Sequence, residues 1–176
     1  MEADRLEKGY IQVYTGNGKG KTTAALGLSL RAVCAGKKVY FAQFIKGMKY
    51  SELNAVKFLD GFSMKQYGRD CFIYNKPTED DIALARKGLN ECAKILSSGK
   101  YDLVVLDEIN IALYYKLFTT DDVLEMLNNK AEGVEVVLTG RYAPPEIIER
   151  ADLVTEMKEI KHYYTKGVEA RVGIEK

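Results

Sequence analysis

A glycine- and lysine-rich stretch near the N-terminus contains the residue types that bind phosphate. It spans residues 15–23 and lies between an apolar run at residues 10–14 and a helix-compatible segment that starts at Ala24. Glycines let successive backbone N–H groups point into one concavity, and the following helix adds the positive end of its dipole. The sequence therefore predicts a phosphate-binding loop. The residues expected to contact a nucleotide are Gly16, Asn17, Gly18, Lys19, Gly20, Lys21, Thr22 and Thr23.

Two side chains of this loop have predicted roles of their own. Lys21 is expected to be an exposed, mobile ammonium that binds phosphate oxygens, and the Thr22 hydroxyl is expected to ligate Mg²⁺. The usual pattern, G-x-x-x-x-G-K-[ST], requires a glycine where this chain has Thr15, and the first glycine here is Gly16. The loop is therefore predicted to be shorter than the usual form. A glycine-rich helix entry that binds no ligand is the alternative interpretation.

Two adjacent carboxylates are candidate metal ligands in addition to the Thr22 hydroxyl. Asp107 and Glu108 directly follow the apolar run at residues 103–106. Mg²⁺ prefers carboxylate oxygen, directly or through water, so Thr22, Asp107 and Glu108 form the predicted metal site. An ordinary charged strand end is the alternative. Arg141 follows another apolar run and is expected to place its guanidinium near phosphate, although an arginine after a strand is often only a surface residue.

Alternating strands and helices must bring the residues of the phosphate-binding loop and of the metal site to one edge of a sheet. Apolar runs predict strands at residues 10–14, 39–45, 62–67, 101–107, 134–138 and 152–156, the last as a core strand. Helical spacing and capping residues predict helices at residues 24–35, 51–59, 79–96, 120–128 and 145–150. The expected caps are Ser51, and Thr78 and Thr119, which are each followed three residues later by an aspartate as in a capping box. This order predicts an α/β fold with a mostly parallel sheet, helices on both faces and the P-loop (RecA-like) nucleotide-binding architecture. Ligands on such sheets bind at the carboxyl ends of the strands.

Length and composition indicate one globular domain over residues 1–176, with a short N-terminal arm at 1–8 and a C-terminal tail at 157–176. The chain has 176 residues, 47% of them hydrophobic, and a net charge of +1. Neither nucleic acid nor a membrane is therefore an expected partner, and the absence of long apolar runs or a signal peptide predicts a cytoplasmic protein. Cys34 and Cys92 are expected to be buried in helices, and His162 receives no role.

Several blocks of the sequence, taken in order, resemble the P-loop-type cob(I)alamin (corrinoid) adenosyltransferases. The resemblance runs from about Gly9 to the end of the chain. The phosphate-loop block is distinctive by itself, and the ordered set is specific. The blocks are residues 14–25, Gln43-Phe44-Ile45-Lys46-Gly47, Leu106-Asp107-Glu108, Thr139-Gly140-Arg141, Lys161-His162, Gly167-Val168-x-Ala170 and Gly173-Ile174.

The resemblance implies a reaction in which cobalt(I) of a corrinoid attacks the 5′-carbon of Mg-ATP and releases triphosphate. In this family the nucleotide lies reversed in the loop, which agrees with a shortened loop. Cobalt(I) is itself a strong nucleophile, so the protein must supply orientation, charge neutralisation and exclusion of water rather than a general base. The resemblance further implies ATP as co-substrate, Mg²⁺, a homodimer, and a reductase or reduced flavoprotein as electron donor.

The family also has a Phe-x-Trp pair that displaces the lower axial ligand of the corrinoid. Phe72-Ile73-Tyr74 stands at that position, with tyrosine in place of tryptophan. The resemblance thus makes Phe72 and Tyr74 catalytic residues together with Lys21, whereas an aromatic pair packed under a loop is the simpler interpretation. Longer members cover the partner subunit's site with an N-terminal helix, and the eight residues before Gly9 are expected to form at most a partial lid.

Two other functions are compatible with parts of the sequence. A P-loop nucleoside triphosphatase or kinase would use Glu108 to position water or an acceptor, and it shares every feature up to Asp107 and Glu108. A non-catalytic corrinoid carrier or sensor would use ATP only as a gate. Phe72, Tyr74 and the shortened loop favour the transferase, and the released product, triphosphate or phosphate, distinguishes it from the triphosphatase.

Overall fold

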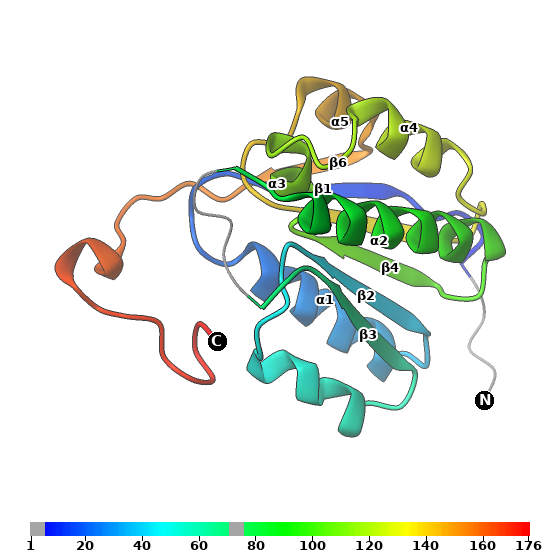
Figure 1. The fold of residues 1–176 in the computed structure, drawn as a ribbon. Helices are drawn as coiled ribbons and strands as arrows, with labels where there is room; N and C mark the ends of the chain where they lie inside the picture. The colour runs from blue at the N-terminus through cyan, green and yellow to red at the C-terminus, as the bar shows by residue number, and fades with distance from the viewer. Residues whose placement is uncertain (1–5, 71–75) are drawn as a thin grey trace.

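The computed structural model describes residues 6–70 and 76–176. At its centre is a sheet in the order β3-β2-β4-β5-β1-β6, in which all paired strands run parallel (Figure 1). The strands are β1 (Ile11–Thr15), β2 (Val39–Phe44), β3 (Phe62–Tyr67), β4 (Leu103–Asp107), β5 (Glu135–Thr139) and β6 (Leu153–Glu156). The helices are α1 (Lys21–Cys34), α2 (Glu79–Ser98), α3 (Ile109–Tyr114), α4 (Thr120–Asn128), α5 (Pro145–Arg150) and the 3₁₀ turns η1 (Ser51–Lys57) and η2 (Tyr163–Lys166).

Each face of the sheet has its own apolar core, because successive strand side chains point to opposite faces. On β4, Val104 and Leu106 belong to one core, whereas Leu103 and Val105 belong to the other. The first core packs against α2, α3, α4 and α5, and the second packs against α1 and η1. The predicted α/β fold with helices on both faces is therefore confirmed.

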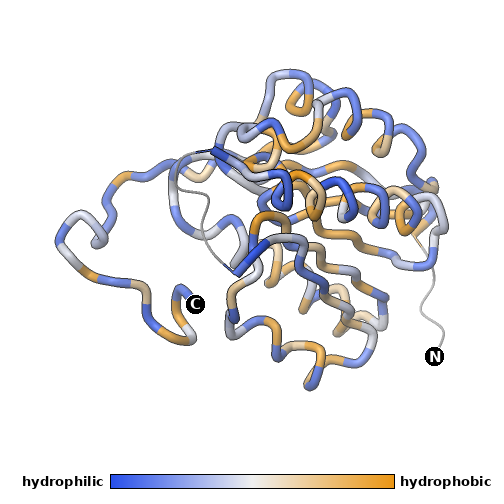
Figure 2. The backbone as a smooth tube through the Cα atoms, in the orientation of Figure 1, coloured by the Kyte–Doolittle hydropathy of each residue, from blue (hydrophilic) through white to orange (hydrophobic). Residues whose placement is uncertain are grey.

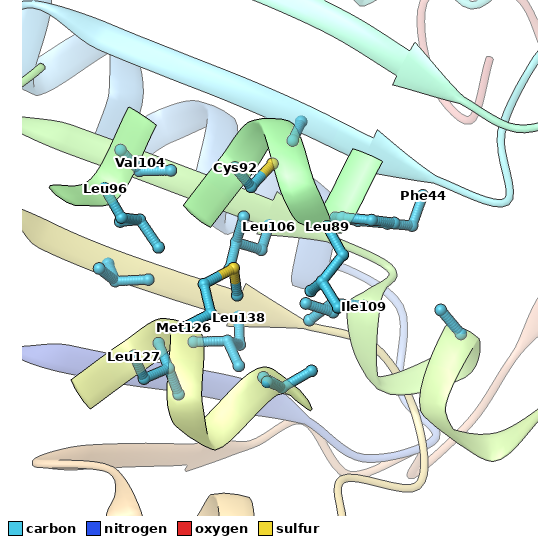
Figure 3. Close-up of a cluster of buried hydrophobic side chains, with 14 of the residues drawn as sticks. Phe44, Leu89, Cys92, Leu96, Val104, Leu106, Ile109, Met126, Leu127 and Leu138 are labelled. Atoms are coloured by element: carbon cyan, nitrogen blue, oxygen red, sulfur yellow. The ribbon is translucent and has the colours of Figure 1, made fainter. Parts of the chain in front are cut away.

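The larger core lies between the sheet and the helices α2 and α4. Figure 3 shows Leu89 and Cys92 of α2 and Met126 of α4 in one cluster with Leu106 and Leu138 of the sheet. In Figure 2 the hydrophobic segments concentrate along the central strands, and the outer sides of the helices are hydrophilic. None of the helices in the described ranges is long and apolar enough to cross a membrane.

Capping residues determine where two of the longer helices begin. At the start of α2 the Thr78 hydroxyl accepts a hydrogen bond from the backbone N–H of Asp81, and the Asp81 carboxylate accepts one from the N–H of Thr78. Thr119 and Asp122 form the same reciprocal pair before α4. Both predicted capping boxes are thus confirmed. Gly99, with a φ of 61°, ends α2 in the left-handed conformation that glycine adopts without strain.

Three local predictions are wrong. The strand at residues 152–156 is not a core strand. Among the described strands, β6 lies at the edge of the sheet and pairs with β1 alone, and it leaves Leu153 46% and Val154 41% exposed. Cys34 is exposed, because it ends α1 on a different side from the buried face that includes Ser29. Ser51 does not cap its turn; its hydroxyl donates to the backbone oxygen of Lys176.

Two helical glycines lie in opposite environments, and this contrast gives a stability prediction. A Cβ on Gly88 of α2 would lie 2.5 Å from Cγ of the Tyr67 ring, whereas a Cβ on Gly27 of α1 would meet nothing within 4 Å. We therefore expect Gly88→Ala to lower the free energy of unfolding by about 1–3 kcal/mol through overpacking. The same change at Gly27 should raise it by up to about 1 kcal/mol through helix propensity.

Urea unfolding of the two variants, which differ from the native chain by the same methyl group, measures both effects. A stabilised Gly88→Ala protein would contradict the close packing of α2 on β3.

Candidate active site

The glycine-rich loop connects the end of β1 to the start of α1 at the carboxyl edge of the sheet. Gly16 and Gly20 have φ values of 93° and 118°, a region that favours glycine. A Cβ on Gly16 or Gly18 would lie 2.5–2.6 Å from the backbone oxygen of Met157. The Gly18 N–H donates to the same Met157 oxygen at 2.6 Å. The chain that follows β6 therefore braces the loop from outside, and this close approach requires glycine at both positions.

Lys21 does not have the exposed position that the sequence predicted. Its side chain is inside the loop, only 8% of the residue is exposed, and Nζ donates to the backbone oxygens of Gly16 and Gly18, each at 2.7 Å. Burial lowers the pKa of Lys21, and the nearby Glu108 carboxylate opposes that shift. The curled loop places its carbonyl oxygens around the ammonium. The spacing of the motif residues does not predict this conformation, so it did not predict that Lys21 is buried.

The Asp107 carboxylate joins residues from four parts of the chain. Its Oδ1 accepts hydrogen bonds from the hydroxyls of Thr22 at 2.8 Å and Thr139 at 2.6 Å. Its Oδ2 accepts from Lys46 Nζ at 2.9 Å and from Gln43 Nε2 at 3.3 Å. Asp107 is fully buried, and these donors come from α1, β5, the loop after β2, and β2. The predicted proximity of Thr22 and Asp107 is confirmed.

Glu108 begins the turn into α3 with a φ of 60°, a left-handed conformation that is rare for residues other than glycine. Its backbone N–H donates to the Thr139 hydroxyl at 3.0 Å, which fixes the turn against β5. Burial, followed by the adjacent Asp107 carboxylate, raises the pKa of Glu108, while Lys46 and Lys21 oppose the shift. Such strain and charge crowding concentrate at functional sites.

A cavity of about 700 Å³ opens at this edge of the sheet. Arg141 extends over the loop, and its Nη2 donates to the backbone oxygen of Asn17 at 3.4 Å. The C-terminal segment, which Figure 1 shows leaving the body of the sheet, contributes residues to the same cavity. The lining residues are Gly18, Lys19, Gly20, Lys21, Thr22, Thr23, Ile45, Lys46, Gly47, Met48, Tyr50, Arg69, Glu108, Ile111, Tyr114, Tyr115, Arg141, Tyr142, His162, Ile174 and Glu175.

The oxygen donors at this edge have the chemistry that Mg²⁺ prefers. Thr22 donates its hydroxyl hydrogen to Asp107, so the lone pairs of Thr22 Oγ1 can still bind a cation. The Glu108 side chain lines the cavity. Within residues 6–70 and 76–176, no three His, Cys, Asp or Glu side chains gather in a way that could hold a metal ion. The residues fit a magnesium ion whose coordination is completed by substrate phosphates rather than by protein alone.

Sequence reasoning gave no individual role to three residues of this site. Gln43 is fully buried within the apolar run of β2. A single amide side chain in such a run indicates a buried hydrogen-bonding partner, and this pattern is visible in the sequence. Lys46 and His162 stand in the family-like blocks without a role of their own, and both line the cavity. The predicted catalytic residues Phe72 and Tyr74 lie outside the described residues.

Comparisons with known proteins agree on one family. A family model described as ATP:corrinoid adenosyltransferase BtuR/CobO/CobP matches residues 7–175. The corrinoid adenosyltransferase of Escherichia coli (strain K12) is 36% identical over 178 residues, covering 96% of this chain and 86% of that protein. The corrinoid adenosyltransferase of Pseudomonas aeruginosa is 38% identical over 173 residues, with 97% and 85% covered. The corrinoid adenosyltransferase CobA of Salmonella typhimurium is 35% identical over 178 residues, with 96% and 86% covered.

The raised pKa of Glu108 gives a prediction about stability and pH in magnesium-free buffer. A carboxyl whose pKa is higher in the folded than in the unfolded protein favours folding below its unfolded pKa, and that contribution is lost as the pH rises through the folded value. Glu108→Gln should therefore be more stable than the native protein at pH 7.5. The gain should be about 1.4 kcal/mol for every tenfold difference between the acid dissociation constants of the folded and unfolded protein, and it should shrink toward pH 5.

Urea unfolding at the two pH values measures this difference. Glu125→Gln is the matched control, because Glu125 lies exposed on α4, and it should stay within about 0.5 kcal/mol of the native protein at both pH values. Equal stability of Glu108→Gln and the native protein at pH 7.5 would contradict the prediction.

Proposed function

The chain belongs to the BtuR/CobO/CobP family of ATP:corrinoid adenosyltransferases, and we propose that it transfers the adenosyl group of ATP to the cobalt of a corrinoid. In the proposed reaction, cobalt(I) attacks the 5′-carbon of ATP, a cobalt–carbon bond forms, and the bond from that carbon to the triphosphate oxygen breaks. The observation that carries the proposal is the Asp107 carboxylate, which orients Thr22 at the glycine-rich loop beside Glu108.

The protein residues of the site act mainly on the charge of the leaving group. Lys21 exchanges the carbonyl oxygens of Gly16 and Gly18 for phosphate oxygens when ATP enters, and Arg141 contacts the same loop at Asn17. Thr22 and Glu108 would hold Mg²⁺, and Asp107 would contact the ion either directly or through a water molecule. When bound, the ion neutralises negative charge that develops on the departing triphosphate.

No protein base takes part in the proposed chemistry, because the nucleophile is a cobalt(I) centre that carries no proton. The protein instead orients ATP against the corrinoid and excludes water, effects that can contribute several kcal/mol to lowering the barrier. The curled loop and the strained turn at Glu108 are already fixed by hydrogen bonds to Met157 and Thr139. The backbone of the loop and of this turn then needs little reorganisation when ATP binds, and the changes are in the lysine side chains.

The proposal includes a homodimer in the cytoplasm and a reductase or reduced flavoprotein that supplies electrons to the corrinoid. Apolar side chains that are exposed near the open edge of the sheet support an interface between copies. They are Ile148 of α5 and Leu153 and Val154 of β6. Sedimentation equilibrium tests the homodimer, and a monomer at micromolar concentration would contradict this part of the proposal.

The released product distinguishes the proposed transferase from a triphosphatase or kinase. The protein is incubated with Mg-ATP and chemically reduced cobalamin, the absorbance of the corrinoid is followed, and the phosphates are separated by ion-exchange chromatography. The transferase should release one triphosphate for each adenosylated corrinoid. Release of ADP and phosphate, with an unchanged corrinoid spectrum, would refute the proposed function.

The loop lysine gives the first prediction on activity. Lys21→Ala should weaken ATP binding by about 1.5–3 kcal/mol, the value of a hydrogen bond to a charged group, which is about 10- to 150-fold. The rate of adenosylation should fall further, because charge builds up on the leaving group. Circular dichroism should remain native, since Lys21 belongs to neither apolar core. Calorimetry with ATP and the rate assay measure the two effects, and near-native values would contradict the assigned role.

The second prediction concerns Phe72, which separates a corrinoid enzyme from other nucleotide-binding proteins. An apolar ring below the corrin plane would exclude the lower ligand and ease the entry of an electron into cobalt(II). Phe72→Ala should therefore slow the reaction that starts from cobalt(II) far more than the reaction supplied with cobalt(I), and Tyr74→Ala should show a weaker form of this asymmetry. The spectrum of bound cobalt(II) is the direct measurement. Equal losses from both cobalt states would favour a packing role.

A further inference from the structure

Lys46 places an ammonium group in the space between the oxygens expected to hold a cation. Its Nζ lies 2.9 Å from Asp107 Oδ2 and 3.4 Å from Thr22 Oγ1. The residue comes two positions after the end of β2, and only 17% of its side chain is exposed. The ring of Tyr50 lies over it, with 5.2 Å between Nζ and the ring centroid.

The contacts of Lys46 overlap with the proposed magnesium site. Thr22 is a proposed ligand, Asp107 stands behind it, and Glu108 faces the same cavity. A buried carboxylate needs a charged partner, because leaving it unpaired costs several kcal/mol. The ammonium of Lys46 is that partner for Asp107. A divalent ion that enters the same space meets a like charge, so the lysine and the metal ion exclude one another.

We propose that Lys46 is a built-in counter-ion that occupies the divalent-cation position in the nucleotide-free protein and leaves it when Mg²⁺ arrives with ATP. The displaced ammonium then pairs with the triphosphate. Its side chain is long and flexible, and it lines the same cavity as Lys21 and Thr22. Lys46 is thus a positioning residue that keeps the metal site closed to free ions. The inference rests on the proposed function, since it takes Thr22 and Glu108 as metal ligands.

The exchange couples metal binding to nucleotide binding. A free divalent ion must break the pair between Lys46 and Asp107, and it offers the lysine no new partner. Mg-ATP brings phosphate oxygens that accept the ammonium, so the same displacement is compensated. The site should therefore bind a divalent ion weakly alone and tightly with nucleotide. Removal of the lysine charge should reduce this difference, because the free ion no longer has to displace the ammonium, whereas the phosphates still contribute ligands.

The test measures Mn²⁺ binding to nucleotide-free protein from the electron paramagnetic resonance signal of the free ion. Lys46→Met removes the charge, and Lys46→Gln also removes it but keeps a hydrogen-bond donor for Asp107, which protects against a folding defect. Both variants should bind Mn²⁺ at least tenfold more tightly than the native protein. Their melting temperatures should rise on addition of Mg²⁺, while that of the native protein should stay constant.

Control variants separate this exchange from a general loss of positive charge. Lys65→Met removes a lysine that is paired with Glu91 at 2.6 Å outside the cavity, and it should leave Mn²⁺ affinity unchanged. In Lys46→Met combined with Glu108→Gln the gain in affinity should disappear. Unchanged Mn²⁺ affinity in both Lys46→Met and Lys46→Gln would overturn the inference.

The same measurements keep this inference distinct from the proposed function. The assay for triphosphate release by the native protein tests the function and involves no Lys46 variant. If the native protein releases no triphosphate, the proposed function fails even when the Lys46 variants bind Mn²⁺ more tightly. If it releases triphosphate and the variants show no change in Mn²⁺ affinity, only the role of Lys46 is refuted.

Discussion

The buried carboxylate of Asp107 is the constraint on which the arrangement of the site depends. A buried charge must be paired and hydrogen-bonded. The partners of Asp107 come from different parts of the chain and are Thr22, Gln43, Lys46 and Thr139. The sheet order makes this possible, because β4 lies between β2 and β5. The same carboxylate orients the threonine at the start of α1. The packing of the strands and the geometry of the phosphate loop are therefore fixed together.

A second constraint acts on the loop from the C-terminal side. The backbone at Met157 follows β6 and lies so close to Gly16 and Gly18 that neither position has room for a Cβ. The hydrogen bond from Gly18 N–H to Met157 oxygen uses a donor that a phosphate-binding loop would otherwise direct at its ligand. β6 thus has a structural function despite its exposed side chains, since pairing with β1 places residue 157 against the loop.

Local patterns predicted most elements, because capping boxes and apolar runs report the conformation of a few neighbouring residues. The starts of α2 and α4 and all six described strands followed from such patterns. The burial of a residue depends on the rest of the molecule, so local sequence patterns did not predict that β6 is exposed or that Lys21 is buried. The six-residue helix α3 was missed because it directly follows the apolar β4 and carries no cap signal. The geometry around Asp107 needed the strand order, which brings Gln43 and Thr139 to the same carboxylate from positions far apart in sequence.

The charges of the site explain why a loop without a general base suits this type of reaction. Asp107 and Glu108 lie near the ammonium groups of Lys21 and Lys46, so these four charges balance one another. ATP adds several negative charges, and the lysines can turn toward them only if another cation compensates the two carboxylates. A divalent ion between Thr22 and Glu108 provides that compensation. The positive charge available to the triphosphate then grows as the ion enters, and it is in place when the bond to the 5′-carbon breaks, where charge stabilisation lowers the barrier most.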